Sequence, residues 1–194
     1  MANFEVAYDT TMGHEGGYVN DPTDYGGETY KGISRKYWPN WDGWRIIDNL
    51  KYKPGFPENL RNDPRLDRSV KKFYKDNFWN GFLGDVIGDQ DIANEIFDTA
   101  VNMGIGKACK FLQKSLNLLN NNGKRYNDIV EDGKMGPNTL TALGEYLRQK
   151  DKSYLLKVMN LLQGNHYIKR MSDDPTQEKF AFGWMSRVEI KKNY

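Results

Sequence analysis

Apolar residues recur every three or four positions through most of the chain, the spacing that places them on one face of an α-helix. The first such stripe starts at Phe4 and runs to Glu15. Later stripes occupy residues 63–82, 89–104, 107–120, 136–150 and 152–171, and a last short helix is expected within 173–192. The pattern predicts a mainly α-helical protein.

Glycine and proline interrupt this pattern near the N-terminus. Gly16 and Gly17 follow the first stripe and are expected to end the first helix, since glycine readily adopts the left-handed C-terminal cap conformation. Residues 18–34 predict a loop, because they contain the turn sequence "DYGGE", with at most a small β-hairpin that includes "TYKGIS". Residues 35–64 are rich in proline and aromatic side chains and are expected to be irregular.

The length of 194 residues suits one domain with a full core, or two small domains. Apolar residues make up 38% and charged residues 28%, a composition typical of a folded globular protein. No internal repeat or low-complexity linker divides the chain. The most suitable boundary lies near residue 88, so we expect halves of 1–88 and 89–194 that pack as one body.

Charge and hydropathy exclude several classes of partner. The 28 basic and 26 acidic residues nearly balance, and no long basic run indicates a nucleic-acid partner. No apolar window is long enough to predict a membrane span. The start of the chain lacks the pattern of a secretion signal, so we expect synthesis in the cytoplasm and action outside only after release or lysis. No obligate protein partner is indicated, and Cys109, the only cysteine, is expected to be a buried hydrophobe.

Glu15 has the setting of a proton donor. It lies about 20° from Phe4 around the predicted helix, within the apolar stripe, and in the last turn, where the helix dipole disfavours an anion. Desolvation and the dipole both raise the pKa of a carboxyl group. A protonated carboxyl is the general acid that cleavage of a glycosidic bond requires. The alternative is that Glu15 points into water at a frayed helix end.

Asp24 and Thr29 follow Glu15 in a segment that is expected to turn back on itself. A returning loop would place both side chains opposite Glu15. Two carboxyl groups that flank the scissile bond are the usual glycosidase arrangement, and Thr29 would hold a water molecule for attack. The alternative for Asp24 is a turn-capping role in "DPTDYGG", and Glu28 is expected to face solvent.

The number and spacing of histidine and serine residues argue against other kinds of catalytic site. A zinc protease motif that starts with "HE" needs a second histidine where this chain has Tyr18. The chain contains two histidines, His14 and His166, too few for a histidine-rich metal site, and it has no G-x-S-x-G sequence for a serine nucleophile. We therefore predict neither a metal nor a cofactor.

Aromatic and polar side chains supply candidates for sugar binding. The segment "YWPNWDGW" contains Trp38 and Trp41, whose flat rings suit stacking on sugar faces, and Tyr18 and Tyr30 are further candidates. The alternative is that most of these rings are core, since four exposed rings would form a costly patch. Asp98 and Asn102 lie one helical turn apart and either line the cleft or have a structural role. These six residues are the predicted substrate-binding set.

The segment "EGGYVNDPTDYGGETYKGIS" closely resembles the signature of glycoside hydrolase family 108, the bacterial and phage N-acetylmuramidases, some of them known as secretion activators. The segment "YKDNFWNGF" is similar to a further motif of that family. The segments "FDTAVNMGIGKACKFLQKSLN" and "EDGKMGPNTLTAL" resemble its peptidoglycan-binding-like half, and "FAFGWMSRV" resembles its closing motif.

The resemblance implies a lysozyme-like helical fold, no cofactor and glycan strands of peptidoglycan as the partner. It implies cleavage of the β-1,4 bond after N-acetylmuramic acid, with Glu15 as the catalytic acid. The order of Glu15, Asp24 and Thr29 is also similar to that in phage-type lysozymes, where the threonine comes about one residue later. Two alternatives stay open: lytic transglycosylase action on the same bond, and a non-catalytic wall-binding or secretion accessory protein.

Overall fold

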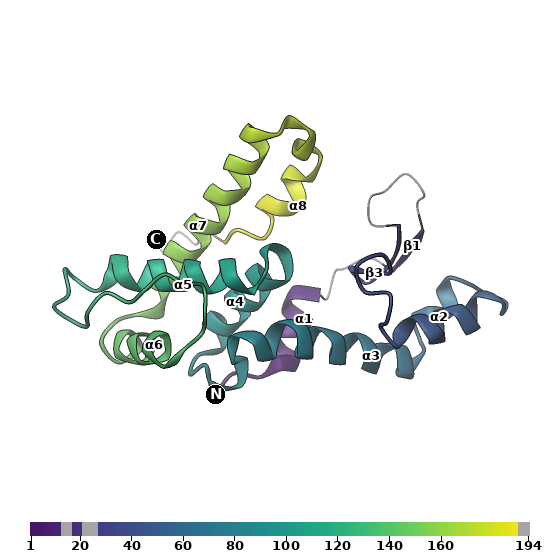
Figure 1. Ribbon diagram of the computed structural model, residues 1–194, viewed down its shortest axis with the longest axis horizontal. Helices are drawn as coiled ribbons and strands as arrows, with labels where there is room; N and C mark the ends of the chain where they lie inside the picture. Colours follow the sequence, from purple (N-terminus) through teal and green to yellow (C-terminus); the bar gives the residue numbers. More distant parts are fainter. Residues whose placement is uncertain (13–16, 21–26, 190–194) are drawn as a thin grey trace. The chain divides into compact units, whose positions relative to one another are not determined.

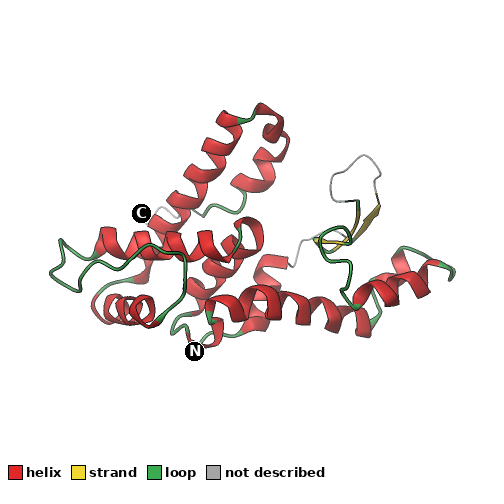
Figure 2. Cartoon of the chain, viewed as in Figure 1, coloured by secondary structure: helices red, strands yellow, loops and turns green. Residues whose placement is uncertain are grey.

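The structure, a computed structural model, describes residues 1–12, 17–20 and 27–189. Figures 1 and 2 show that these residues are mainly helical and form one small antiparallel sheet, as the sequence predicts. The helices are α1 (Phe4–Met12), α2 (Gly43–Lys51), α3 (Pro64–Tyr74), α4 (Gln90–Met103), α5 (Ile105–Leu119), α6 (Pro137–Gln149), α7 (Lys152–Asp173) and α8 (Ala181–Met185). The mainly α, lysozyme-like fold class is confirmed.

Short irregular helices and strands complete the fold. The π-helix η2 (Lys75–Trp79) continues α3, and the 3₁₀ segments are η1 (Glu58–Leu60), η3 (Asn80–Phe82), η4 (Gly84–Val86) and η5 (Pro175–Phe180). The strands are β1 (Tyr18–Asn20), β2 (Glu28–Tyr30) and β3 (Ile33–Ser34), with β2 in the middle. In the part of the chain that the structure describes, no helix is long and apolar enough to cross a bilayer.

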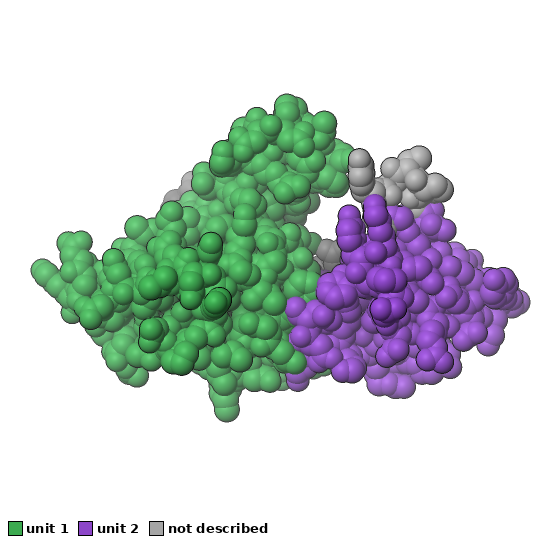
Figure 3. Space-filling view, in the orientation of Figure 1, with its two compact units in different colours: residues 1–7, 78–194 green, residues 8–77 purple. Residues whose placement is uncertain are grey.

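The chain forms two compact units, which Figure 3 colours separately. Unit 1 contains Met1–Ala7 and Phe78–Tyr194, and unit 2 contains Tyr8–Asn77. The predicted boundary near residue 88 stays a prediction.

The sheet of unit 2 turns sharply between β2 and β3. Within "TYKGIS", part of the predicted small hairpin, Lys31 and Gly32 both have positive φ, 43° and 76°, and separate two strands. Two consecutive positive φ values belong to the tight turns that match strand twist. A Cβ at Gly32 would lie 2.7 Å from the Tyr74 hydroxyl, which donates a hydrogen bond to the Lys31 carbonyl at 2.7 Å. Only glycine fits this position.

Helix α2 corrects the expectation that residues 35–64 are irregular. Trp44, Ile47 and Leu50 recur at helical spacing and are buried, so this short helix has an apolar face. Helix α3 starts at Pro64, and the Asp63 side chain caps it by accepting hydrogen bonds from the next backbone amides. The Arg65 side chain, together with those amides, lowers the pKa of Asp63 to about 2.

The core of unit 1 forms where α4 and α5 pack together and α7 covers them. Trp79 is fully buried there, with its ring 5.8 Å from Phe4 and 6.0 Å from Phe97 between centroids, and its indole N–H donates to Asp85. Cys109 is buried on α5, as predicted. The expected helix near the C-terminus is present as η5 followed by α8.

Candidate active site

The predicted catalytic residues lie at the start of unit 2. Glu15 and Asp24 fall outside the described residues, so their roles stay predictions. Thr29 is described: it lies on β2, pairs with Val19 of β1, and its hydroxyl donates to the Gly27 carbonyl at 3.3 Å. It is half-buried. The structure thus fixes the strand that follows Asp24 in the chain.

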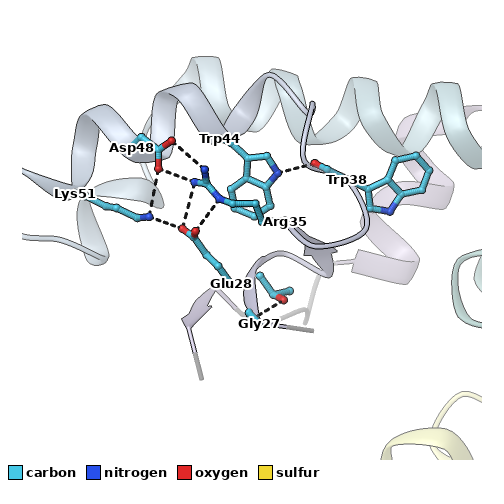
Figure 4. Close-up of polar contacts among 8 residues, drawn as sticks. Gly27, Glu28, Arg35, Trp38, Trp44, Asp48 and Lys51 are labelled. Atoms are coloured by element: carbon cyan, nitrogen blue, oxygen red, sulfur yellow. Dashed lines mark hydrogen bonds and ion pairs between the residues drawn. The ribbon is translucent and has the colours of Figure 1, made fainter. Parts of the chain in front are cut away.

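A network of ion pairs holds β2 against α2 (Figure 4). Glu28 was expected to face solvent, but only 13% of its side chain is exposed. Its carboxylate oxygens lie 2.7 Å from the Arg35 Nε and 2.7 Å from the Lys51 ammonium group. The expectation was wrong because these cations come from elsewhere in the fold, from the segment after β3 and from α2. Glu28 therefore has a structural role in fixing the strand that carries Thr29.

Asp48 of α2 contacts the same two cations, Arg35 and Lys51, that pair with Glu28. It accepts two hydrogen bonds from the Arg35 guanidinium, at 2.6 and 3.0 Å, and lies 3.3 Å from Lys51. The Arg35 hydrogen bond is the main cause that keeps the pKa of Asp48 below its ordinary value. The guanidinium also lies 4.5 Å from the centroid of the Trp44 ring. Two carboxylates and two cations balance, so the network ties β2 to α2 without net charge.

Tyr18 and Tyr30, two of the predicted sugar-binding residues, pair across β1 and β2 but differ in exposure. Tyr18 is half-buried, with its ring edge-on to Phe56 at 4.8 Å between centroids. Burial, and then the nearby Glu28 carboxylate, raise the pKa of the Tyr18 hydroxyl. Tyr30 is only 2% exposed and donates its hydroxyl hydrogen to the Leu60 carbonyl. Its burial argues against the predicted stacking on sugar.

The tryptophans sort into core and surface as the sequence analysis anticipated. Trp44 is 2% exposed and donates to the Trp38 carbonyl at 2.8 Å. Trp41 is half-buried, stacks on Tyr30 and donates to the Ser69 carbonyl, and a Cβ on Gly43 would lie 2.2 Å from its ring. Trp38, by contrast, is 40% exposed. Only Trp38 of these three rings has substantial surface for a ligand.

A pocket of about 330 Å³ lies beside Trp38 and within unit 2. Its lining combines aromatic rings with charged and amide side chains: Tyr37, Trp38, Pro39, Asn40, Trp41, Asp42, Ser69, Lys72, Phe73, Asp76 and Asn77. Phe73 and Trp38 pack perpendicular to each other, with an interplanar angle of 87° and 4.9 Å between centroids. Lys72 and Asp76, both in the lining, form an ion pair. Flat rings beside planar polar groups suit a sugar ring, whose faces are apolar and whose edge carries hydroxyls.

Asp98 and Asn102 belong to unit 1 and contact each other through the backbone. The Asn102 amide donates to the Asp98 carbonyl at 2.8 Å. The Asp98 carboxylate pairs with Arg187 at 2.7 Å and accepts from Gln163 at 3.0 Å. These contacts join α4 to α7 and to the C-terminal segment, which supports the structural alternative for Asp98. Asn102 is exposed, and its substrate-binding role stays a prediction.

Sequence reasoning missed two groups of charged side chains. The partners of Glu28 were not identified, although Asp48 and Lys51 are one turn apart on α2 and their spacing is a signal. The half-buried carboxyl of Glu95 was also missed; the signal was its position one turn after the buried Ile92 on α4. Among the described residues, no group of three or more histidine, cysteine or acidic side chains is arranged to hold a metal ion.

Comparison with known proteins supplies the family. A family model described as glycosyl hydrolase 108 matches residues 8–104, and one described as a predicted peptidoglycan domain matches residues 107–189. No curated protein matches the chain. The solved structure of Brucella abortus SagA is similar, with 24% identity, a TM-score of 0.61, and coverage of 95% of this chain and 88% of that one. At this level of identity the likeness shows a shared fold.

The first family model covers half of the chain and includes Glu15, Asp24, Thr29 and the pocket beside Trp38. The second includes α6, α7 and nearly all of α5. A glycosidase region joined to a peptidoglycan domain acts on the bacterial cell wall. The chain therefore belongs to glycosyl hydrolase family 108 and is a peptidoglycan hydrolase with a C-terminal peptidoglycan domain.

Proposed function

We propose that the enzyme is an N-acetylmuramidase, which cleaves the β-1,4 bond between N-acetylmuramic acid and N-acetylglucosamine. The observation that carries the proposal is the match of the glycosyl hydrolase 108 model over residues 8–104, which contain the sequence from Glu15 to Thr29. Because the substrate is the wall, we propose that the enzyme acts there after release from, or lysis of, the cell that makes it.

In the proposed reaction Glu15 donates its proton to the bridging oxygen as the bond to the sugar carbon breaks. Asp24 stabilises the positive charge that develops on that carbon, or holds the attacking water together with Thr29. Water then adds its hydroxyl to the sugar carbon, and its remaining proton returns to a carboxylate. The fixed position of β2, which Glu28 ties to α2, supports Thr29 as a positioning residue.

The first alternative is a lytic transglycosylase, in which the C6 hydroxyl of the same sugar attacks in place of water and forms a 1,6-anhydro ring. Mass spectrometry of digested peptidoglycan separates the two, since each hydrolytic cut adds one water, about 18 Da. We expect fragments that end in reducing N-acetylmuramic acid. Anhydro ends would show the transglycosylase reaction, and reducing N-acetylglucosamine ends would show cleavage of the other glycosidic bond.

Trp38 is proposed to stack on a sugar of the glycan strand, because its flat ring lines the pocket and is 40% exposed. Trp38→Ala is expected to raise KM for solubilised glycan strands about 2- to 13-fold, the effect of losing an aromatic contact of about 0.5–1.5 kcal/mol. The value of kcat should change less, since the ring does not touch the reacting atoms.

Tyr52→Ala is the matched control, because Tyr52 is 92% exposed in the same unit and does not line the pocket. Its KM should equal that of the wild type. If both variants raise KM alike, the effect is not specific to the pocket, and if neither does, Trp38 does not bind the glycan.

A further inference from the structure

A cluster of basic side chains lies on unit 1, where α5 and α7 pack together. The Lys107 ammonium group of α5 is 3.5 Å from Nδ1 and 3.3 Å from Nε2 of His166, on α7. A hydrogen bond from Lys107 to one imidazole nitrogen would bring the ammonium group much closer to that nitrogen than to the other. The near-equal distances therefore show a contact with the ring that is not a well-formed hydrogen bond. Arg170 lies one turn after His166 and on the same side of α7. We call Lys107, His166 and Arg170 the basic cluster.

Among the residues that the structure describes, the side chains of the basic cluster make no direct ion pair with a carboxylate. The Asp174 carboxylate, four residues after Arg170, is within electrostatic reach: hydrogen bonds with Thr176 and, after them, the charge of Arg170 lower the pKa of Asp174. The Arg170 Nε donates to the amide oxygen of Gln177 at 3.3 Å, a neutral partner. The pKa of His166 lies below its ordinary value because of burial and because of the positive charges of Lys107 and Arg170. Lys107 and Arg170 place positive charge beside His166 that no direct ion pair neutralises, and a bound anion would be attracted to that charge.

Two further features describe the anion that would fit. Aromatic rings flank the cluster: Phe111 lies 6.4 Å from the His166 ring between centroids, and Trp184 lies 5.9 Å from the Arg170 guanidinium carbon. Both rings are half-buried, and Trp184 also stacks on Tyr167 and Phe180, so the remaining part of each ring is open to a ligand. The net charge of the chain is only +2, which does not favour a long polyanion. The surface therefore suits a small ligand that combines carboxylates with apolar groups.

We propose that the basic cluster binds the carboxylates of the peptide stems that branch from peptidoglycan. The stems carry free carboxylates on short chains with methyl and methylene groups, which match the cations and the two rings. All of these residues lie within the segment that matches the peptidoglycan domain, residues 107–189. The inference rests on the function as a peptidoglycan hydrolase, and it gives unit 1 a peptide ligand distinct from the glycan that is cleaved.

The test uses the full chain and a stem tripeptide without sugar, L-alanyl-γ-D-glutamyl-diaminopimelate, which holds no glycosidic bond. Binding is followed by NMR of the His166 ring, which a His166→Gln variant identifies because the chain has two histidines. We expect saturable shifts and a rise in the pKa of His166, since a bound carboxylate favours the charged imidazole. Lys107→Met and Arg170→Met should each weaken binding at least about tenfold.

Lys157→Met is the matched control: Lys157 is exposed on α7, and the substitution makes the same charge change outside the cluster. It should bind as the wild type does, and circular dichroism should show that all variants are folded. Absence of saturable binding, equal binding of a tripeptide with amidated carboxyls, or equal binding of inorganic phosphate would each overturn the proposal. Because the probe has no sugar, failure of the muramidase proposal leaves this result unchanged.

Discussion

Replacing Glu15 by glutamine is expected to lower the rate of peptidoglycan hydrolysis by about 10²- to 10⁴-fold, the usual contribution of a positioned general acid. Glutamine keeps the size of the side chain but has no proton that it can give to the leaving oxygen. The measurement is the release of reducing ends from purified peptidoglycan at a fixed enzyme concentration. Binding to the wall should persist, because the substitution removes the chemistry and leaves the binding surfaces in place.

Glu58→Gln provides the matched control, since Glu58 is an exposed carboxyl of the same unit. Its activity should equal that of the wild type. The pH profile adds a second readout: the alkaline limb of kcat/KM should report the ionisation of Glu15 in the free enzyme. Full activity of Glu15→Gln would show that another group donates the proton. Wall binding without cleavage by the wild type would instead favour the non-catalytic alternative.

The helices with long apolar stripes could be predicted from the sequence, whereas α2 could not. Its face of Trp44, Ile47 and Leu50 has helical spacing, but the helix has only nine residues and lies between Pro39 and Pro54. Isolated helices of this length are marginal, so packing of the apolar face decides whether the helix forms. Local helix propensity therefore did not indicate α2, and the packing of its apolar face determines that the helix forms.

The environment of each candidate site residue was harder to predict than its identity. Trp38 and Trp44 are the same residue type six positions apart, yet one is 40% and the other 2% exposed. Glu28 was assigned to solvent because its partners, Arg35 and Lys51, come from other segments of the fold. Such pairings depend on strand register and helix placement, which single-sequence patterns do not contain.

Unit 1 is expected to lose stability as the pH rises, because the carboxyl of Glu95 is protonated in the folded protein. It lies on α4 and accepts hydrogen bonds from Asn160 of α7 at 2.9 Å and from the Thr99 hydroxyl at 3.5 Å. Burial, and then the neighbouring Asp98 carboxylate, raise the pKa of Glu95 from an ordinary 4.5 to about 8. The carboxyl is therefore mostly protonated at neutral pH in the folded protein and ionised in the unfolded chain.

The direction of the effect follows from proton uptake. Between pH 4.5 and about 8 the folded state binds a proton that the unfolded chain has released, so stability falls as the pH rises through this window. The contribution is fully present below pH 4.5 and lost above about pH 8. A pKa change from 4.5 to about 8 corresponds to a free-energy difference on the order of 5 kcal/mol.

Glu95→Gln should remove this dependence, because glutamine has the size of the protonated acid and cannot ionise. Its amide oxygen can accept from Asn160, and its amide hydrogens can donate to Thr99. We expect wild type and variant to be similar near pH 4.5, and the variant to be more stable at pH 9 by up to about 5 kcal/mol. Hydrogen exchange of the α4 and α7 amides at both pH values measures this unit directly. Glu178→Gln, at an exposed site of the same unit, is the control and should show the same pH dependence as the wild type. If Glu95→Gln loses as much hydrogen-exchange protection at pH 9 as the wild type does, the proposal that Glu95 is protonated in the folded protein is contradicted.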